Sequence, residues 1–389
     1  MKIVCAPDSF KGSVTAAEAA AALAAGARQV FAEAEVLQLP FADGGEGTLD
    51  ALLAVWEREP ETVKTVDALG REVEARYGLS PDGRTAIIEA AEANGLPQVS
   101  DAPPQPLRAD THGVGRIAHH VLDGSLNGRQ VQEVLLCIGG SATTDGGTGI
   151  LRGLGAEFLD DDGAPVPPGG EGLTQIARID DSALHPRARE VRWRIAVDVD
   201  NPLVGPRGAA EVFGPQKGAE AADIEALDEG LSSLAQVLAG AHGHSAESYR
   251  TAEGFGAAGG IPLTLVALLG AEVVPGSTMV AEAVGLEAAL ADAHLVLTGE
   301  GRLDSQSLSG KVVDAVVARA PGSAAVVVIA GAVQLSAGQC RAHGITAAFS
   351  IAPGAASLEE LQDDSARLIE DTAAQACALV ARSYAPVSG

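Results

Sequence analysis

Cysteine is scarce in this chain of 389 residues. Its four cysteines, Cys5, Cys137, Cys340 and Cys377, lie far apart and form no Cys-x-x-Cys pair. This spacing excludes a disulfide framework or a zinc knuckle as the basis of the fold. Cys5 and Cys137 stand in apolar runs typical of strands, where a small buried thiol is an ordinary core residue. We therefore expect free thiols and a reducing, cytoplasmic compartment.

Positive charge is scarce as well. The chain has 26 Lys and Arg against 52 Asp and Glu, which gives a formal net charge of -26 and an isoelectric point near 4.5. Nucleic acids and anionic membranes need a basic face on their partner, so both are excluded as partners. ATP is not excluded, because the net charge governs solubility whereas a local field governs the binding of a small anion.

Long apolar runs are missing too. The longest, residues 263–274, is too short to span a bilayer and contains Glu272. The N-terminal residues begin a strand at once and lack the apolar region and cleavage site of a signal peptide. Hydrophobic residues make up 47% of the chain and aromatic residues only 3%, so we expect a globular core of small aliphatic side chains. The length suits two domains or one large one.

Both ends of the chain read as parallel α/β structure. Short strands at residues 3–6 and 36–39 alternate with helices at 15–31 and 47–56, and strands at 294–297, 324–330 and 347–351 precede a last helix at 358–381. Close-spaced strands at 63–67, 73–79 and 85–89 predict antiparallel pairing in between. We therefore predict one domain from residues 1–61 and 289–389, with an inserted α/β domain at residues 62–288.

Three of only five lysines stand beside glycines in segments that read as loops. They are Lys11, Lys217 and Lys311. A lysine next to a glycine, where the backbone can approach closely, is suited to holding an anion such as phosphate. In a chain of such negative charge, these loops are the first candidates for a phosphate site.

Carboxylates recur in similar glycine-rich segments. They are Asp43 and Glu46 in residues 42–48, Asp145 in residues 144–147, and Glu300 in residues 298–304. Carboxylate oxygens suit a divalent cation, and a phosphate that binds beside such a cation needs donors like the lysines. Glycine and aspartate also form ordinary turns, and that alternative stands for each segment taken alone. Their agreement across six segments favours a site.

The segment from Gly139 to Gly149 follows a predicted strand at residues 134–138. Gly139, Gly140 and Ser141 would bring backbone N–H groups and a hydroxyl to one strand end, with Asp145 a few residues on. Ligands of open α/β sheets bind at the carboxyl ends of the strands. We interpret this segment as a phosphate cradle, and the alternative is a flexible connection to the next helix.

Asp198 ends another predicted strand, at residues 195–197. With Asp200 and Asn201 it offers a general base or a metal ligand, and an Asx turn before Pro202 is the structural alternative.

Three other patterns carry no assignment. Residues 254–259 fit Gly-x-Gly-x-x-Gly but follow no clear strand, and Gly310-Lys311 lacks the earlier glycine of a P-loop. His119 and His120 have no cysteine or carboxylate cluster nearby in the sequence, so a surface or capping role is expected.

Taken in order, the motifs of this chain closely resemble those of the type-1 glycerate kinase family. They lie at residues 6–13, 42–48, 139–147, 198–203, 212–219 and 298–304. Thr144 stands where much of that family has Asn. The resemblance implies a flavodoxin-like (Rossmann-like) parallel-sheet domain formed by both chain ends, an inserted second α/β domain, and an active site in the cleft between them.

The resemblance also implies phosphorylation of D-glycerate by ATP with Mg²⁺, with 2-phosphoglycerate the favoured product. Another small hydroxy acid as substrate, or a catalytically silent sugar-acid sensor, are the alternatives. A sensor would not need the full set of lysines and carboxylates. The sequence leaves the oligomeric state open.

We assign roles to the candidate residues on this basis. Transition-state charge in phosphoryl transfer must be neutralised and the reactants aligned. Lys11, Lys217 and Lys311 would neutralise phosphate; Gly139, Gly140 and Ser141 would cradle it; and Asp43, Glu46, Asp145 and Glu300 are the candidate metal ligands. Arg302 would clamp the glycerate carboxylate. Asp198 is the favoured base, with Asp8 as the second choice.

Overall fold

The computed structural model describes residues 1–126, 128–242 and 245–384. The chain divides into two compact units. The first unit comprises Met1–Asp43, Asp50–Glu57 and Ser277–Gly389, and the second comprises Gly44–Leu49 and Arg58–Gly276. The sequence predicted domain limits at residues 61/62 and 288/289. That these limits enclose independently folding domains stays a prediction.

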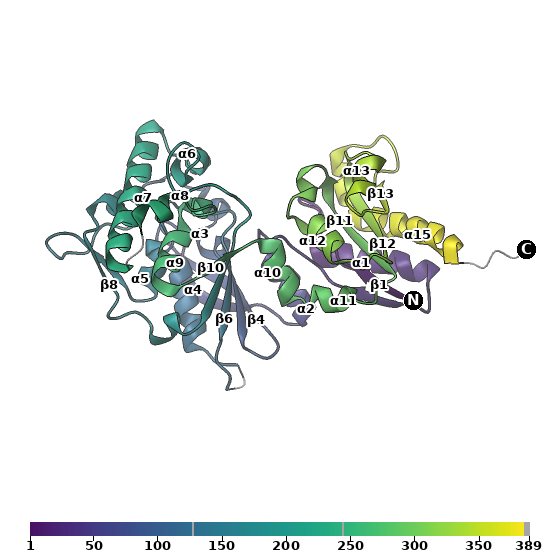
Figure 1. The fold of residues 1–389 in the computed structure, drawn as a ribbon, viewed down its shortest axis with the longest axis horizontal. Helices are drawn as coiled ribbons and strands as arrows, with labels where there is room; N and C mark the ends of the chain where they lie inside the picture. The colour runs from purple at the N-terminus through teal and green to yellow at the C-terminus, as the bar shows by residue number, and fades with distance from the viewer. Residues whose placement is uncertain (127, 243–244, 385–389) are drawn as a thin grey trace, which may run out of the picture. The chain divides into compact units, whose positions relative to one another are not determined.

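A five-stranded parallel sheet forms the centre of the first unit (Figure 1). Its strand order is β13-β12-β11-β1-β2, and every neighbouring pair is parallel. Counted along this unit alone, the order is 2-1-3-4-5, which is the flavodoxin-like arrangement. The strands are β1 (Lys2–Cys5), β2 (Glu35–Gln38), β11 (Leu295–Leu303), β12 (Ala325–Val333) and β13 (Ala347–Ser350).

Helices cover both faces of this sheet. Alternate residues of β12 belong to different cores, with Val327 and Ile329 packed with α1 (Ala16–Val30) and α15 (Ser365–Tyr384). Val328 and Ala330 pack instead with α12 (Val312–Arg319) and α13 (Ala337–Ala342). A strand buried on both faces reads as a continuous apolar run, as the sequence of β12 does.

The second unit contains a six-stranded mixed sheet of order β10-β9-β6-β5-β4-β3. The pairs β3·β4 and β4·β5 are antiparallel, which confirms the predicted pairing, and the remaining pairs are parallel. The strands are β3 (Glu61–Val66), β4 (Glu72–Leu79), β5 (Thr85–Glu89), β6 (Glu133–Cys137), β9 (Arg192–Ala196) and β10 (Glu272–Val274).

Helices α4 (His112–Asp123), α5 (Thr148–Gly153), α7 (Ala221–His242) and α9 (Ile261–Leu269) bury their apolar residues in the core of this second unit. The other elements are α2 (Thr48–Trp56), α3 (Ala91–Asn94), α6 (Ala209–Phe213), α8 (Ala246–Thr251), α10 (Gly276–Ala283), α11 (Leu286–Leu290), α14 (Leu358–Asp363), β7 (Glu157–Leu159) and β8 (Arg178–Asp180).

The prediction that β11 ends at Leu297 is wrong. The strand continues to Leu303, and its pairing with β12 extends to Leu303↔Val333. Glu300 and Arg302 therefore lie in a strand and not in a loop. A Cβ atom on Gly299 would lie 1.9 Å from the carbonyl oxygen of Ile329, so this glycine permits close approach of two strands and does not mark a turn.

The single last helix predicted at residues 358–381 is also wrong, because two helices meet at Asp364. Ser365 donates its hydroxyl hydrogen to the carbonyl of Leu361, and Asp364 accepts a hydrogen bond from Arg367. Ser and Asp form such local hydrogen bonds in competition with regular helix, which accounts for the break.

The predicted fold class, a flavodoxin-like α/β domain from both chain ends with a second α/β domain inserted, is confirmed by these two sheets. All four cysteines are free and buried. Among the described residues, no helix is long and apolar enough to cross a membrane.

Candidate active-site residues in the two units

Three carboxylates from neighbouring strands meet in the first unit, and we call them the carboxylate group. Asp8 follows β1, Asp43 comes after β2, and Glu300 lies in β11. The backbone N–H of Asp8 donates to the carbonyl of Gly299 at 2.8 Å, which holds the loop after β1 against β11. Strand order β11-β1-β2 therefore brings together residues almost 300 positions apart in the sequence.

Asp8 has an abnormal acidity in this setting. Burial raises its pKa to about 7, and the charges of Asp43 and Glu300 act in the same direction. The backbone N–H of Ser9, which donates to Asp8 Oδ1 at 2.6 Å, and the ammonium of Lys11 oppose the rise. Desolvation and like charge thus outweigh these partners, and a large fraction of Asp8 is protonated near neutral pH.

Glu300 shows the same kind of shift. Burial raises its pKa, and Asp304 and Asp43 add to the effect, whereas a hydrogen bond from Ser307 and the charge of Lys311 oppose it. Its Oε1 atom is buried and has no hydrogen-bond partner among the described residues. A buried carboxylate oxygen without a donor is costly unless a cation or another donor meets it.

The carboxylate group fits a divalent cation on these observations. Asp8 and Glu300 have raised pKa values, and Glu300 Oε1 is buried without a hydrogen-bond partner among the described residues. With Asp43 beside them, they offer the hard oxygen ligands that Mg²⁺ prefers. The positive charges of the same unit oppose the raised pKa values only in part, since Lys11 acts on Asp8 and Lys311 on Glu300. Lys11 is exposed, Lys311 caps the start of α12, and Arg302 points from an exposed position of β11.

Lys217 is the central residue of the second unit's candidate site. It ends a short 3-10 helix, Pro215–Lys217, and is only 5% exposed. Its ammonium donates to Ser141 Oγ at 3.2 Å and to the carbonyl of Thr143. Burial lowers the pKa of Lys217 to about 7, although the charge of Asp145 acts to raise it. We call Lys217, Ser141 and Asp145 the lysine site.

Asp145 is held by the protein more fully than a metal ligand would be. Its Oδ2 accepts hydrogen bonds from the backbone N–H and hydroxyl of Thr111, at 2.9 and 2.7 Å, and from Gly149 N–H at 3.1 Å. Its Oδ1 accepts from Gly147 N–H at 3.1 Å. Four donors leave little lone-pair capacity for a cation, so we do not retain Asp145 among the proposed metal ligands. It shapes the glycine-rich loop and supports Lys217.

The glycines predicted to cradle phosphate follow β6. Gly140 has a φ of 72°, which favours glycine, and both it and Gly139 are exposed, whereas Ser141 is buried. The loop is anchored because Leu96 N–H donates to the Gly140 carbonyl at 2.9 Å and Ala142 N–H to the Asn94 carbonyl at 2.7 Å. The exposed glycine backbone therefore lies on a fixed support.

Asp198 and Glu46 belong neither to the carboxylate group nor to the lysine site. Asp198 is exposed at the end of β9, and its Oδ1 accepts the backbone N–H of Gly276 at 2.9 Å. Glu46 is exposed, and its carboxylate makes no contact with the other candidate residues among the described part of the chain. The segment that carries Glu46 packs closely, because a Cβ on Gly44 would lie 2.7 Å from Ala196 Cβ.

Sequence reasoning missed three polar residues that organise the second unit. Thr111 holds Asp145; the amide of Asn94 donates to Thr143 Oγ1 at 3.2 Å; and buried Glu89, at the end of β5, accepts the Leu49 N–H at 2.7 Å. The position of Glu89 at a strand end was a detectable signal. Thr111 and Asn94 gave none, since both are isolated polar residues far from the loop they support.

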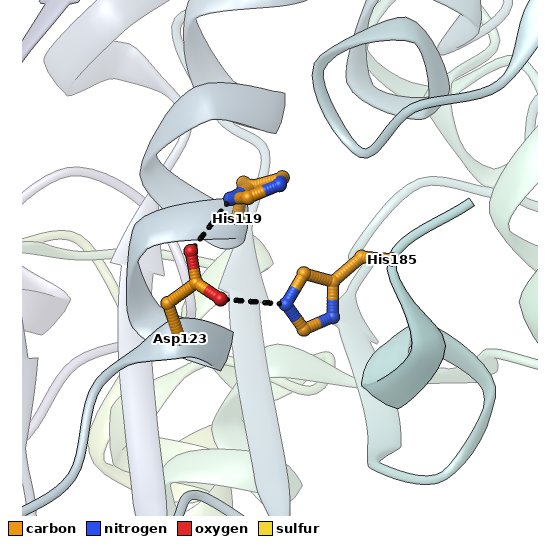
Figure 2. Close-up of side chains that lie close together, drawn as sticks. All are labelled: His119, Asp123 and His185. Carbon is orange, nitrogen blue, oxygen red and sulfur yellow. Dashed lines mark hydrogen bonds and ion pairs between the residues drawn. The ribbon is translucent and has the colours of Figure 1, made fainter. Parts of the chain in front are cut away.

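A histidine cluster occurs elsewhere in the second unit (Figure 2). Asp123 pairs with His119 Nδ1 at 3.2 Å and with His185 Nε2 at 3.1 Å. His185 Nδ1 also accepts the backbone N–H of Arg187, so the neutral ring carries its hydrogen on Nε2. That nitrogen donates to Asp123 and has no lone pair for a metal. The cluster therefore has a structural role. Through Asp123 it links α4 to the segment before β9, and His185 caps the short helix that begins at Pro186.

Comparison with known proteins identifies the family. A model of the glycerate kinase family matches residues 3–381. The chain is 44% identical to the glycerate kinase of Bacillus subtilis over 96% of each chain. It is 42% identical to the glycerate 2-kinase of Escherichia coli, over 92% of this chain and 93% of the other.

A solved structure agrees with these matches. The crystal structure of a Salmonella typhimurium LT2 protein described as glycerate kinase 2 superposes with a TM-score of 0.88 at 41% identity, over 99% of both chains. The predictions of this family and of an enzyme are confirmed. The chain belongs to the glycerate kinase family.

Proposed function

We propose that this protein transfers the γ-phosphoryl group of ATP to the 2-hydroxyl of D-glycerate with the help of Mg²⁺. The family and the name of the Escherichia coli relative, glycerate 2-kinase, support the acceptor and the position. The observation that carries the proposal is a pair of buried ionisable sites whose pKa values shift in opposite directions. Burial raises the pKa values of Asp8 and Glu300 in the first unit and lowers that of Lys217 in the second, so an added cation would stabilise the charged form of the first and an added anion that of the second.

Asp43 and Glu300 are the proposed Mg²⁺ ligands. Glu46 belongs to the second unit, and its role as a metal ligand stays a prediction. When bound, Mg²⁺ supplies neutralisation of charge on the phosphate oxygens. Lys11 and Lys311 flank the carboxylate group and add positive charge for the same anion. In this proposal the first unit therefore binds a metal-bearing phosphate and does not use its carboxylates as nucleophiles.

Asp8 is now the favoured base. Its pKa of about 7 lies near the working pH, which is where a base accepts a proton and releases it again with the least cost. Asp198, the first choice from sequence, is exposed and commits one oxygen to the Gly276 N–H. We therefore propose that Asp8 accepts the hydroxyl proton of glycerate and that Asp198 helps to fix the backbone around residue 276.

Lys217, Ser141 and the exposed backbone of Gly139 and Gly140 form the proposed phosphate cradle. Below a pH of about 7 the Lys217 ammonium is charged, and an arriving phosphate favours that charged form at higher pH as well. Arg302 projects an exposed guanidinium, which suits a bidentate contact with the glycerate carboxylate. The cleft between the two domains as the place of reaction, and the cytoplasmic location, stay predictions.

The test is turnover of ATP with Mg²⁺ and D-glycerate, followed by phosphorus NMR of the product. L-glycerate, tartronate and a reaction without acid are the controls. We expect a D-glycerate-dependent signal from a phosphate on the 2-position. A product on the 3-position would correct the regiochemistry. Binding of glycerate without turnover would replace the enzyme with a sensor, and turnover only with another acid would change the substrate.

A further inference from the structure

A cavity of about 410 Å³ lies in the second unit and reaches Lys217. We propose that this cavity, which we call the nucleoside pocket, receives the adenosine part of ATP. The inference rests on the proposed function, since it locates one half of the nucleotide that the proposed reaction consumes. Its volume falls in the range of small-molecule sites, about 300–1,000 Å³.

The lining of the pocket suits a purine and does not suit glycerate. Lys217 is the single charged residue among those that line it, and the walls are mostly aliphatic, with Leu69, Leu96 and Val99 among them. A three-carbon hydroxy acid carries a charge and polar groups on every carbon, so it gains little from such walls. A flat heterocycle gains from apolar surfaces on both faces, with a few polar groups to orient it.

Polar groups for that orientation are present at the pocket. Gln105, Gln216 and Ser100 are among the residues that line it. The Ser100 hydroxyl donates to the Pro97 carbonyl at 2.7 Å and Gln105 Oε1 accepts from Arg108 at 3.1 Å, so the amide N–H groups of both glutamines and the amide oxygen of Gln216 are the groups proposed for the ligand. An amide carries both a donor and an acceptor, which matches the amino group and ring nitrogens of adenine. The pocket thus combines broad apolar contact with a small number of hydrogen-bonding side chains.

The connection to the lysine site specifies a ligand with a phosphate. Lys217 and Ala142 line the pocket, and Lys217 donates to Ser141 Oγ in the glycine-rich loop. A ligand in the pocket therefore has one end beside the predicted phosphate cradle. A nucleotide has this chemistry, an apolar ring at one end and anionic groups at the other.

Residues 102–106 contain three prolines and form part of the pocket wall. Pro103 and Pro104 line the pocket, and a Cβ atom on Gly218 would lie only 2.1 Å from Pro104 Cβ. Gly218 itself has a φ of 87°, which favours glycine. The wall of the pocket is therefore packed directly on the turn that carries Lys217, and proline keeps that wall rigid.

A neighbouring cavity of about 300 Å³ provides the contrast. Arg108, His112 and the ion pair of Arg152 with Asp110 line it. A purine placed there would desolvate charged groups without pairing them, which is unfavourable. Neither Lys217 nor the glycine-rich loop contributes to its lining. The assignment therefore goes to the larger cavity.

The experiment fills the pocket and measures ADP binding to the full chain by isothermal titration calorimetry. Ser100→Trp places a large ring from an exposed rim position, and Ala102→Trp does so from a second position. Each is expected to weaken ADP binding by about tenfold or more, equivalent to about 1.4 kcal/mol. Inorganic tripolyphosphate lacks a nucleoside, so its affinity is expected to stay within about twofold of the wild type.

Pro168→Trp is the matched control, because Pro168 is exposed and lines only the smaller of these two cavities. It is expected to bind ADP as the wild type does. Unchanged ADP affinity in both pocket variants would overturn the proposal, and so would an equal loss of ADP and tripolyphosphate affinity. A wild type that binds no ADP would overturn it too.

Steady-state kinetics separates this inference from the proposed function. The pocket variants should raise KM for ATP and leave KM for glycerate unchanged. If the wild type turns over glycerate and the variants bind ADP normally, only the assignment of the nucleoside pocket is wrong. If the wild type shows no glycerate-dependent turnover but the variants lose ADP selectively, the pocket stands and the proposed reaction is wrong.

Discussion

The two units bury charges whose acidities shift in opposite directions. In the first unit, burial and the charges of Asp43 and Glu300 raise the pKa of Asp8 to about 7, even though the ammonium of Lys11 acts to lower it. In the second unit, burial lowers the pKa of Lys217 to about 7 even though the charge of Asp145 acts to raise it. Groups of opposite type reach similar pKa values because desolvation penalises any ion. The difference supports the proposal that the first unit binds a cation and the second an anion.

The surroundings of the two sites differ in the same sense. Asp145 accepts four hydrogen bonds from protein donors and is complete without a ligand. Glu300 leaves Oε1 buried and unpartnered among the described residues. One carboxylate therefore serves the structure, whereas the other is available to a metal. The predictions below test this contrast.

The largest effect is expected from Lys217→Met, which keeps the aliphatic stem and removes the ammonium. If Lys217 stabilises charge on the transferred phosphate, kcat/KM should fall by roughly 10³-fold, as for the loss of one preorganised electrostatic donor. Steady-state kinetics measures this. Lys64→Met, at an exposed position of β3, is the control and should leave kcat/KM unchanged. Equal kinetics in the two variants would remove Lys217 from the mechanism.

Asp145→Asn should act on stability. The new amide would set an N–H group against the N–H donors of the loop, and hydrogen bonds to a charged acceptor would be lost. We expect the free energy of unfolding to fall by roughly 3 kcal/mol, measured by urea denaturation without ligand. Asp161→Asn, in an exposed turn, is the control. A variant of normal stability that binds Mg²⁺ more weakly would return Asp145 to the metal ligands.

Glu300→Gln should separate metal affinity from stability. The loss of one charged ligand is expected to weaken Mg²⁺ binding by about 10- to 100-fold. The metal-free protein should be as stable as the wild type or more so, because a desolvated carboxylate is replaced by a neutral amide. Calorimetric Mg²⁺ titration and thermal melting measure the two effects. Glu287→Gln, on exposed α11 surface, should change neither.

The smallest effect is a pH dependence of ADP binding. Free Lys217 loses its proton near pH 7, so above that pH the bound anion must restore the proton, and affinity should fall by up to about tenfold per pH unit. Lys217→Met should show no such slope. The lowered pKa of Lys217 also makes the stability of the fold depend on pH. Between pH values of about 7 and 10.5, Lys217 is protonated in the unfolded chain and deprotonated in the folded one. Its contribution to the free energy of unfolding therefore becomes more favourable to the folded state as the pH rises.

The sequence was enough to select candidate residues for both sites but not to predict their surroundings. A lysine beside a glycine was enough to select Lys217, but its near-complete burial depends on the packing of the second unit. Glu300 was selected as a candidate but placed in a loop, because glycines at 299 and 301 look like turn residues when the partner strand β12 is unknown. Sequence patterns indicate which side chains are chemically suited to a site, whereas their secondary structure and burial depend on strand pairing.

The missed residues follow from the same limit. Thr111 is 34 positions before Asp145, and Asn94 is 49 positions before Thr143, so no spacing rule connects them. The sheet order of the first unit was more accessible, since alternating strands and helices predict parallel pairing. The choice of the general base shows both what the sequence can predict and what needs the structure. Asp8 was a candidate by position, and only burial beside Asp43 and Glu300 raises its pKa and moves it ahead of Asp198.

The proposed division of a cation site in the first unit and an anion site in the second is tested most directly by titrating Mg²⁺ and tripolyphosphate, each alone, into the wild type, Glu300→Gln and Lys217→Met. The account predicts that Glu300→Gln weakens Mg²⁺ binding and spares tripolyphosphate, and that Lys217→Met does the reverse. Both variants weakening both ligands, or neither variant weakening its own, would contradict it.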